Sequence, residues 1–234
     1  MLDILAFGAH PDDVEIGIGG TIAVHTAKGY RCGIVDLSKG EKASHGNPEE
    51  RMLEGEKAAR VLGAEVRECA NLPDAFIKND GDSREKVIQL IRKYRPKIVL
   101  CPYFDDNHPD HINASLLVKE ACHLSGLLKY PIEGKPYRPT QLFYYFLGKT
   151  ADPTLLIDIS SQVDIKWKAI ACHKSQFSLP SEVRVETMVN SPVFIQYLKS
   201  RDQFFGSLIR VPYAEGLVPE GKLFLNNLFS LGGE

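Results

Sequence analysis

Short apolar runs alternate with amphipathic segments over the first half of the chain. The apolar runs end at polar or glycine-containing loops, and they predict buried strands at 2–8, 32–37, 65–70 and 98–102. Between them, apolar residues recur at helical spacing and predict helices at 17–29, 48–62, 83–94 and 112–124. Gly63 fits the end of the second helix, and Ser83 fits the N-cap of the third.

This alternation predicts an α/β fold with a Rossmann-like, mostly parallel sheet and helices on both faces. In such sheets, ligands bind beyond the carboxyl ends of the strands. The second half is less regular. Strands are expected at 142–147 and 154–159, a helix at 160–173, then a polar loop through Ser191 and a helix from there to about 205. No linker or repeat interrupts the chain. We therefore expect one domain over 1–234, whose part from about 140 to 234 extends the sheet and closes over the site.

Composition and charge narrow the class of protein. Hydrophobic residues make up 44% and charged residues 25% of the 234 positions, which is ordinary for a globular protein. The net charge of -2, without a basic run, predicts neither nucleic acid nor an anionic membrane as a partner. No segment is apolar for the roughly 20 residues of a membrane span, and the N-terminus lacks signal-peptide features. A cytoplasmic location is expected, with the five scattered cysteines reduced.

Histidine and aspartate concentrate in two loops that follow predicted strands. The first loop reads HPDD (10–13), and the second reads DDNHPDH (105–111). Because both leave the carboxyl ends of parallel strands, they can meet above the sheet. Imidazole and carboxylate groups suit zinc, and a catalytic zinc has about three protein ligands. The pattern predicts one zinc ion per chain, held by His10, Asp13 and His111.

Asp12 and His108 are the candidate catalytic groups beside these ligands. With Asp13 on the metal, Asp12 can accept a proton from the attacking water as a general base. His108 can stabilise an oxyanion or protonate the departing amine. The alternatives are ordinary: Asp12 merely caps the following helix, and a lone loop histidine is usually a surface or hydrogen-bonded residue.

A dinucleotide site is the main alternative for the glycine-rich segment GIGG (17–20), because Asp36 lies near the end of the second strand. The G-x-G-x-x-G spacing fails, since the register from Gly17 needs a glycine where Ile22 stands. A pyrophosphate at this turn would also be repelled by the carboxylates of Asp12, Asp13 and Glu15. We therefore interpret the glycines as allowing close packing of helix on sheet.

These motifs resemble those of the LmbE-like, or PIG-L, N-acetylglucosamine deacetylases. The resemblance rests on AHPDDVEIGIGGT (9–21) and HPDH (108–111), with supporting segments at 72–74, 175–177 and 213–216. Within the family, the chain looks most similar to the bacillithiol-biosynthesis deacetylases, which act on N-acetylglucosaminyl-malate. The resemblance implies zinc-dependent hydrolysis of the N-acetyl group of a small GlcNAc conjugate, with the ligands and catalytic residues named above. It also implies a homo-oligomer, with a hexamer as the expected form.

The resemblance further implies that Arg51 binds the polar or anionic part of the substrate. A guanidinium suits that role because it can hold a carboxylate with two hydrogen bonds. The alternative is a salt bridge within its own helix, to Glu50 or Glu54. Glu41 and Asn113 are candidates for binding sugar hydroxyls, although ordinary loop solvation explains them equally well.

Two positions depart from the bacillithiol-type pattern. Asn107 stands where several relatives carry an arginine before HPDH, which removes one candidate carboxylate contact. Phe194 stands near the place of an active-site tyrosine, with Tyr197 close by. The aglycone therefore stays open, with a chito-oligosaccharide or another GlcNAc conjugate as alternatives. A metal- or sugar-binding protein without turnover is the alternative outside enzymes; Asp12 argues against it, because pure binding needs no spare base.

Overall fold

The computed structural model describes residues 1–178, 187–224 and 227. Seven strands are described: β1 (Ile4–Gly8), β2 (Cys32–Asp36), β3 (Val66–Cys69), β4 (Ile98–Pro102), β5 (Gln141–Tyr145), β6 (Leu155–Asp158) and β7 (Ala214–Pro219). The described helices are α1 (Asp13–Ala27), α2 (Pro48–Leu62), α3 (Gly81–Tyr94), α4 (Pro109–Leu124), α5 (Val163–Ile170), α6 (Lys174–Phe177) and α7 (Pro192–Leu208).

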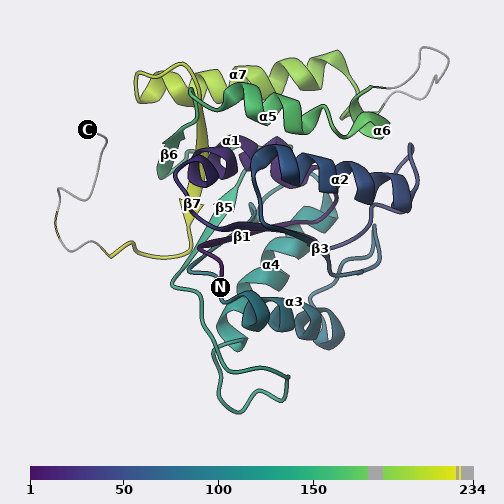
Figure 1. The fold of residues 1–234 in the computed structure, drawn as a ribbon, viewed down its shortest axis with the longest axis vertical. Coiled ribbons are helices and arrows are strands. Elements are labelled where there is room, and N and C mark those ends of the chain that lie inside the picture. The colour runs from purple at the N-terminus through teal and green to yellow at the C-terminus, as the bar shows by residue number, and fades with distance from the viewer. Residues whose placement is uncertain (179–186, 225–226, 228–234) are drawn as a thin grey trace.

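The strands form one mixed sheet in the order β3-β2-β1-β4-β5-β7-β6. Strands β1 to β5 run parallel, whereas β7 is antiparallel to both β5 and β6. In Figure 1, α3 and α4 lie below the sheet, and α1, α2, α5 and α7 lie above it. The predicted α/β class, with a mostly parallel sheet and helices on both faces, is confirmed; the single domain over 1–234 stays a prediction.

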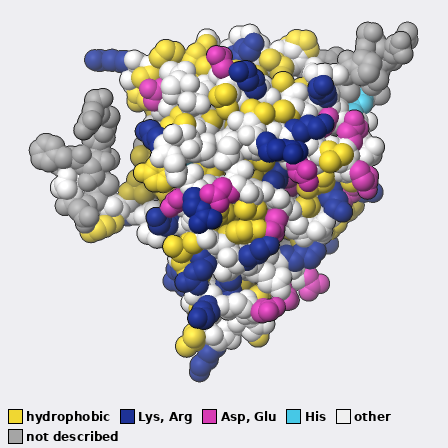
Figure 2. Space-filling model, viewed as in Figure 1, with side chains coloured by type: hydrophobic (Ala, Val, Ile, Leu, Met, Phe, Trp, Pro, Cys, Tyr) yellow, Lys and Arg dark blue, Asp and Glu magenta, His cyan; other side chains and the backbone are white. Residues whose placement is uncertain are grey.

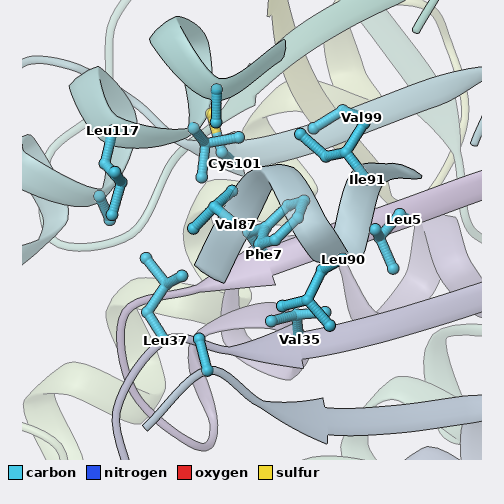
Figure 3. Close-up of a cluster of buried hydrophobic side chains, with 14 of the residues drawn as sticks. Leu5, Phe7, Val35, Leu37, Val87, Leu90, Ile91, Val99, Cys101 and Leu117 are labelled. Atoms are coloured by element: carbon cyan, nitrogen blue, oxygen red, sulfur yellow. The ribbon is translucent and has the colours of Figure 1, made fainter. Parts of the chain in front are cut away.

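Strand β1 is buried on both faces, as expected for a parallel strand between two helical layers. Side chains alternate along a strand, so Leu5 and Phe7 enter one hydrophobic cluster while Ile4 and Ala6 enter the other. Figure 3 shows the first cluster, in which Leu5 and Phe7 meet the helical side chains of Val87 and Ile91 among others. These two cores hold β1 and its C-terminal loop in place.

Several element bounds differ from the sequence prediction. Helix α1 begins at Asp13 rather than Gly17, and α4 begins at Pro109 rather than Ile112. The N-cap of α3 is Asp80, whose side chain accepts a hydrogen bond from the Ser83 amide. Neither first turn shows helical periodicity. In α1, the apolar Val14 and Ile16 alternate with acidic residues, and α4 begins with the proline and two polar residues of PDH.

The C-terminal half differs more strongly. Strand β7 was not predicted, yet it lies between β5 and β6. The helix expected at 160–173 is the shorter α5, followed by the four-residue α6. Part of the expected polar loop before 191, residues 179–186, lies outside the described residues.

The surface carries charges of both signs. Figure 2 shows basic and acidic side chains interspersed with apolar ones on the visible face. Among the described helices, none combines the length and the apolarity needed to cross a membrane. The five cysteines are free thiols, and Cys32, Cys101 and Cys122 are buried.

Candidate active site

Two loops converge at the carboxyl ends of β1 and β4. These strands are parallel neighbours, with Ile4 opposite Ile98 and Ala6 opposite Leu100. The loop after β1 leads into α1, and the loop after β4 leads into α4. Helix α4 starts with His108 as N-cap and Pro109 in its first turn, which places His111 one turn into the helix. The sheet order therefore brings the two histidine–aspartate loops together.

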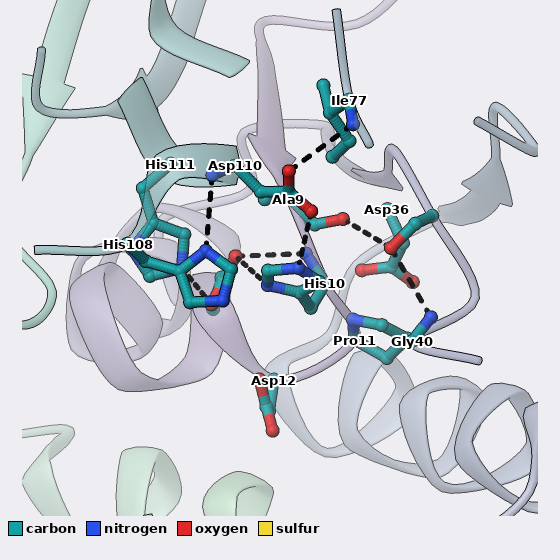
Figure 4. A network of polar contacts seen from close by, with 12 residues as sticks. Ala9, His10, Pro11, Asp12, Asp36, Gly40, Ile77, His108, Asp110 and His111 are labelled. Atoms are coloured by element: carbon teal, nitrogen blue, oxygen red, sulfur yellow. Dashed lines mark hydrogen bonds and ion pairs between the residues drawn. The ribbon is translucent and has the colours of Figure 1, made fainter. Parts of the chain in front are cut away.

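His10, Asp13 and His111 form a compact group in this place. One ligand atom from each lies within 4.8 Å of the others. His111 Nε2 is 3.3 Å from Asp13 Oδ1, and His10 Nδ1 is 3.6 Å from Asp13 Oδ2. Figure 4 shows the histidines of this site side by side. Two imidazoles and one carboxylate are the donor set that a catalytic zinc uses.

Further carboxylates hold the outer nitrogens of both histidines. His111 Nδ1 lies 2.9 Å from Asp106 Oδ1. His10 Nε2 lies 3.1 Å from Asp74 Oδ1 and 3.3 Å from Asp110 Oδ2. Each ring thus presents its other nitrogen to Asp13. Metal-binding histidines usually have such a carboxylate partner, which fixes the ring and raises its basicity.

The neighbouring carboxylates favour positive charge at His10 and His111. Burial would lower the pKa of His10, but hydrogen bonds with three carboxylates raise it well above its ordinary value. Burial likewise opposes charge on His111, yet the charge of Asp13 and the bond to Asp106 raise its pKa to about 9. A divalent cation would satisfy the same excess of negative charge, so the residues present fit a zinc ion.

A second group, His10, His108 and Asp110, also brings its ligand atoms within 4.8 Å. Its carboxylate and one nitrogen of His108 already take part in hydrogen bonds to backbone amides. Asp110 accepts hydrogen bonds from the backbone amides of Ala75, at 2.8 Å, and Ile77, at 3.3 Å. His108 Nδ1 accepts from the Asp110 amide at 3.1 Å. We therefore favour the group that contains Asp13 and His111.

Asp12 lies beside this group and outside it. Its φ of 117° is in the left-handed region, which is unusual for a residue other than glycine. In Figure 4 its side chain points away from His10, His108 and His111. The side chain makes no capping hydrogen bond to α1, which speaks against a merely structural cap. Burial raises the pKa of the Asp12 carboxyl to about 6, while the charge of Arg51 lowers it.

Arg51 is buried in the second turn of α2 and points toward Asp12. The helix start is set by Asn47, which accepts from the Glu50 amide, and by Pro48. Arg51 Nη2 donates to the carbonyl of Pro11 at 2.7 Å and lies 3.3 Å from Asp12 Oδ2. Its partner is thus Asp12 rather than a carboxylate of its own helix.

These groups line a pocket of about 230 Å³. His10, Asp12, Asp13, Arg51, His108 and His111 all border it. Its wall also contains residues without a predicted role: Ile16, Lys42, Ala43, Asp74, Ala75, Leu147, Gly148, Gln176, Met188 and Val189. Phe194 lines the pocket too, whereas Tyr197 borders a neighbouring groove.

Glu41 and Asn113 are not among the described residues that line this pocket. Glu41 instead accepts a hydrogen bond from the Asp74 amide, so it supports the loop that holds His10. The carboxylates of Asp74, Asp106 and Asp110 were not predicted as site residues. Asp106 and Asp110 belong to the second histidine–aspartate cluster. Asp74 lies far from both clusters in sequence, and its signal was the supporting segment 72–74 of the family resemblance.

Residues 5–122 match the model of the PIG-L family, described as GlcNAc-PI de-N-acetylase. This chain belongs to the PIG-L family. The predicted resemblance to the PIG-L, or LmbE-like, deacetylases is thereby confirmed. The predicted enzyme class, an N-deacetylase, agrees with the description of this family.

Three similar proteins span most of this PIG-L chain. A diacetylchitobiose deacetylase of Thermococcus kodakarensis is 30% identical and covers 92% of this chain and 81% of its own. The conserved protein TT1542 of Thermus thermophilus is 37% identical, with a TM-score of 0.88 over 96% of this chain and 97% of its own. A 4-oxalmesaconate hydratase of Pseudomonas putida is 29% identical over 74% of this chain and 73% of its own.

Proposed function

We propose that this PIG-L protein is a zinc-dependent hydrolase that removes the acetyl group from a small N-acetylglucosaminide. One observation carries the proposal. Two histidines, each backed by a carboxylate, converge with Asp13, and a further buried carboxylate, Asp12, borders the same pocket without joining the ligand group. A binding site needs no such additional carboxylate, whereas hydrolysis of an amide needs a proton acceptor.

Zinc at this site would acidify a water molecule and polarise the acetyl carbonyl. His10, Asp13 and His111 would hold it. Asp12 accepts the proton as the water oxygen bonds to the carbonyl carbon. The same carboxyl then returns the proton to the amide nitrogen as the carbon–nitrogen bond breaks, and the products are acetate and the free amine.

His108 is oriented as a hydrogen-bond donor. Because its Nδ1 accepts from the Asp110 amide, the neutral ring carries its proton on Nε2. Burial lowers the pKa of His108, and the neighbouring His10 and His111 lower it further. Of the two predicted roles, we propose the first: Nε2–H donates to the carbonyl oxygen as negative charge develops there.

For the aglycone, we propose malate, and thus a place in bacillithiol biosynthesis. Two cationic residues, Lys42 and Arg51, line the pocket and suit a carboxylate. The Nε of Arg51 has no acceptor among the described residues, although that atom is buried. An anionic substrate group close to the guanidinium would complement its charge.

A neutral second sugar is the other candidate. A groove of about 630 Å³ shares Gly148, Met188 and Phe194 with the pocket, and none of its described lining residues is charged. The rings of Phe194 and Tyr197 lie 6.0 Å apart at 27°, which offers two aromatic surfaces to a sugar. The 30% identity to a diacetylchitobiose deacetylase supports the same candidate.

An acetate-release assay tests these proposals. Its substrates are N-acetylglucosaminyl-malate, diacetylchitobiose and free GlcNAc, each with and without a chelator. Hydration of 4-oxalmesaconate, followed separately by loss of that compound, is the contrasting reaction. We expect release from at least one glucosaminide, loss of that activity with the chelator and its return with zinc. Hydration of 4-oxalmesaconate without deacetylation would reject the proposed function.

Replacing Arg51 by alanine is expected to raise KM for the malate conjugate by about 10- to 150-fold, because a hydrogen bond to a charged group contributes about 1.5–3 kcal/mol. KM for diacetylchitobiose should change less. Any loss of kcat through the Asp12 contact should be common to both substrates. Steady-state kinetics of Arg51→Ala and of the charge-preserving Arg51→Lys, with both substrates, measure the separate changes in KM and kcat. Equal effects on both KM values would contradict a carboxylate contact.

The proposed partner is therefore a small N-acetylglucosaminide. The homo-oligomer, the hexamer and the cytoplasmic location stay predictions. Glu41 and Asn113 stay predicted contacts for sugar hydroxyls.

A further inference from the structure

Helix α1 is interrupted one turn after the metal-binding aspartate. Ile18 has φ -143° and ψ 23°, which is not helical. In an unbroken helix the Gly20 amide would donate to the Ile16 carbonyl. Here the Ile16 carbonyl accepts from Arg201 Nη2 at 2.8 Å, and the Gly20 amide donates to Glu215 Oε1 at 3.0 Å. The Thr21 amide donates to the second oxygen of Glu215 at 2.6 Å.

Four buried charges surround this break: Lys166, Arg201, Asp202 and Glu215, which we name the α1 clamp. Lys166 Nζ lies 2.5 Å from Asp202 and 2.7 Å from Glu215. Arg201 Nε donates to Asp202 at 3.1 Å. None of the four is more than 6% exposed. Two cations and two anions balance, which buried ions require.

The α1 clamp also reaches the pocket wall. Arg201 Nη1 donates to the Phe146 carbonyl at 3.0 Å, and Leu147, the next residue, lines the pocket. One guanidinium therefore joins the first turn of α1 to the segment after β5. That first turn begins with Asp12 and Asp13. Close packing leaves it little freedom, because a Cβ on Gly17 would lie 2.3 Å from the Tyr145 ring.

We propose that Arg201 and Glu215 are positioning residues for the metal site. They hold the two halves of α1 at the break, so that the turn carrying Asp13 keeps the carboxylate of Asp13 oriented toward His10 and His111. Neither residue is among the described residues that line the pocket or form the ligand group. The inference rests on the proposed function only in assigning zinc to this site.

Two conservative variants test this proposal. Arg201→Lys keeps the charge and loses the forked contacts, and Glu215→Gln keeps the size and loses one acceptor oxygen. We expect both to bind zinc about 10- to 100-fold more weakly, the range for groups that orient metal ligands. Zinc affinity is measured by competition with a chromogenic chelator, at a temperature where circular dichroism shows every variant folded. In the active enzyme, kcat should fall more than KM rises.

Arg92→Lys is the matched control. Arg92 is 5% exposed and donates to the carbonyls of Ser125 and Leu127, each at 3.1 Å, but it lies in α3 on the opposite face of the sheet. This variant should lose thermal stability while keeping wild-type zinc affinity.

Wild-type zinc affinity in both clamp variants would overturn the proposal, as would an equal loss of affinity in Arg92→Lys. A wild-type protein without deacetylase activity would reject the proposed function. In that case, the zinc affinities of the variants would still test whether Arg201 and Glu215 position the metal site.

Discussion

Replacing Asp12 by asparagine is expected to lower kcat by about 10²–10⁴-fold, the usual contribution of general-base catalysis. Asparagine keeps the side-chain size and tolerates the left-handed backbone that Asp12 adopts, so the turn before α1 should be preserved. It cannot accept the proton of the attacking water. KM should change little, and zinc should still bind, because Asp12 is outside the ligand group.

Zinc content, melting temperature and kcat, measured on one Asp12→Asn sample, separate the possible roles. A helix cap would lower stability by roughly 1 kcal/mol and leave kcat nearly intact. Loss of zinc would mean that Asp12 is a ligand. Arg51→Lys is a useful companion, because it disturbs the Asp12 contact without removing the carboxylate. Near-normal turnover in Asp12→Asn would reject Asp12 as the general base.

Replacing His111 by alanine is expected to remove most bound zinc and nearly all deacetylase activity. His111 supplies one of three protein ligands, and its Nε2 is the atom that faces Asp13. Two remaining ligands are fewer than the three protein donors that a catalytic zinc site uses, so the zinc affinity should fall steeply. Metal content by elemental analysis and activity with added zinc are the measurements.

His123→Ala is the control for this variant, since His123 is an exposed histidine on the same helix, α4. It should retain about one zinc per chain and wild-type kcat. Asp106→Asn should give an intermediate result, with zinc affinity lowered about 10- to 100-fold, because Asp106 holds the outer nitrogen of His111. Full zinc occupancy in His111→Ala would refute the proposed ligand set.

The alternation of apolar runs and amphipathic segments was enough to predict the parallel half of the fold. The buried parallel strand Ile4–Gly8 is continuously apolar or small, and Cys32–Asp36 is so up to its last residue, Asp36. Helices such as Pro48–Leu62 carry their own stop signal, Gly63 with φ 73°. Those signals are local. The same alternation predicted that the loops after β1 and β4 converge, because parallel strands align their carboxyl ends.

Strand β7 had no comparable signal. Its residues Ala214–Pro219 lie between β5 and β6, far from both in sequence, and a glycine interrupts its apolar pattern. Antiparallel insertion into a sheet depends on pairing between distant segments, which periodicity does not encode. The same holds for Glu215, whose position in β7 places it against the break in α1.

The sequence by itself determined which side chains are capable of binding a metal: His10, Asp13 and His111 stand in two motifs whose composition suits zinc. Only the tertiary structure decided which other groups support them. Asp74 reaches His10 from a separate loop, and Arg51 reaches Asp12 from α2. The physical reason is that ligand chemistry belongs to single residues, whereas burial, hydrogen-bond partners and shared charge arise only when distant segments pack together.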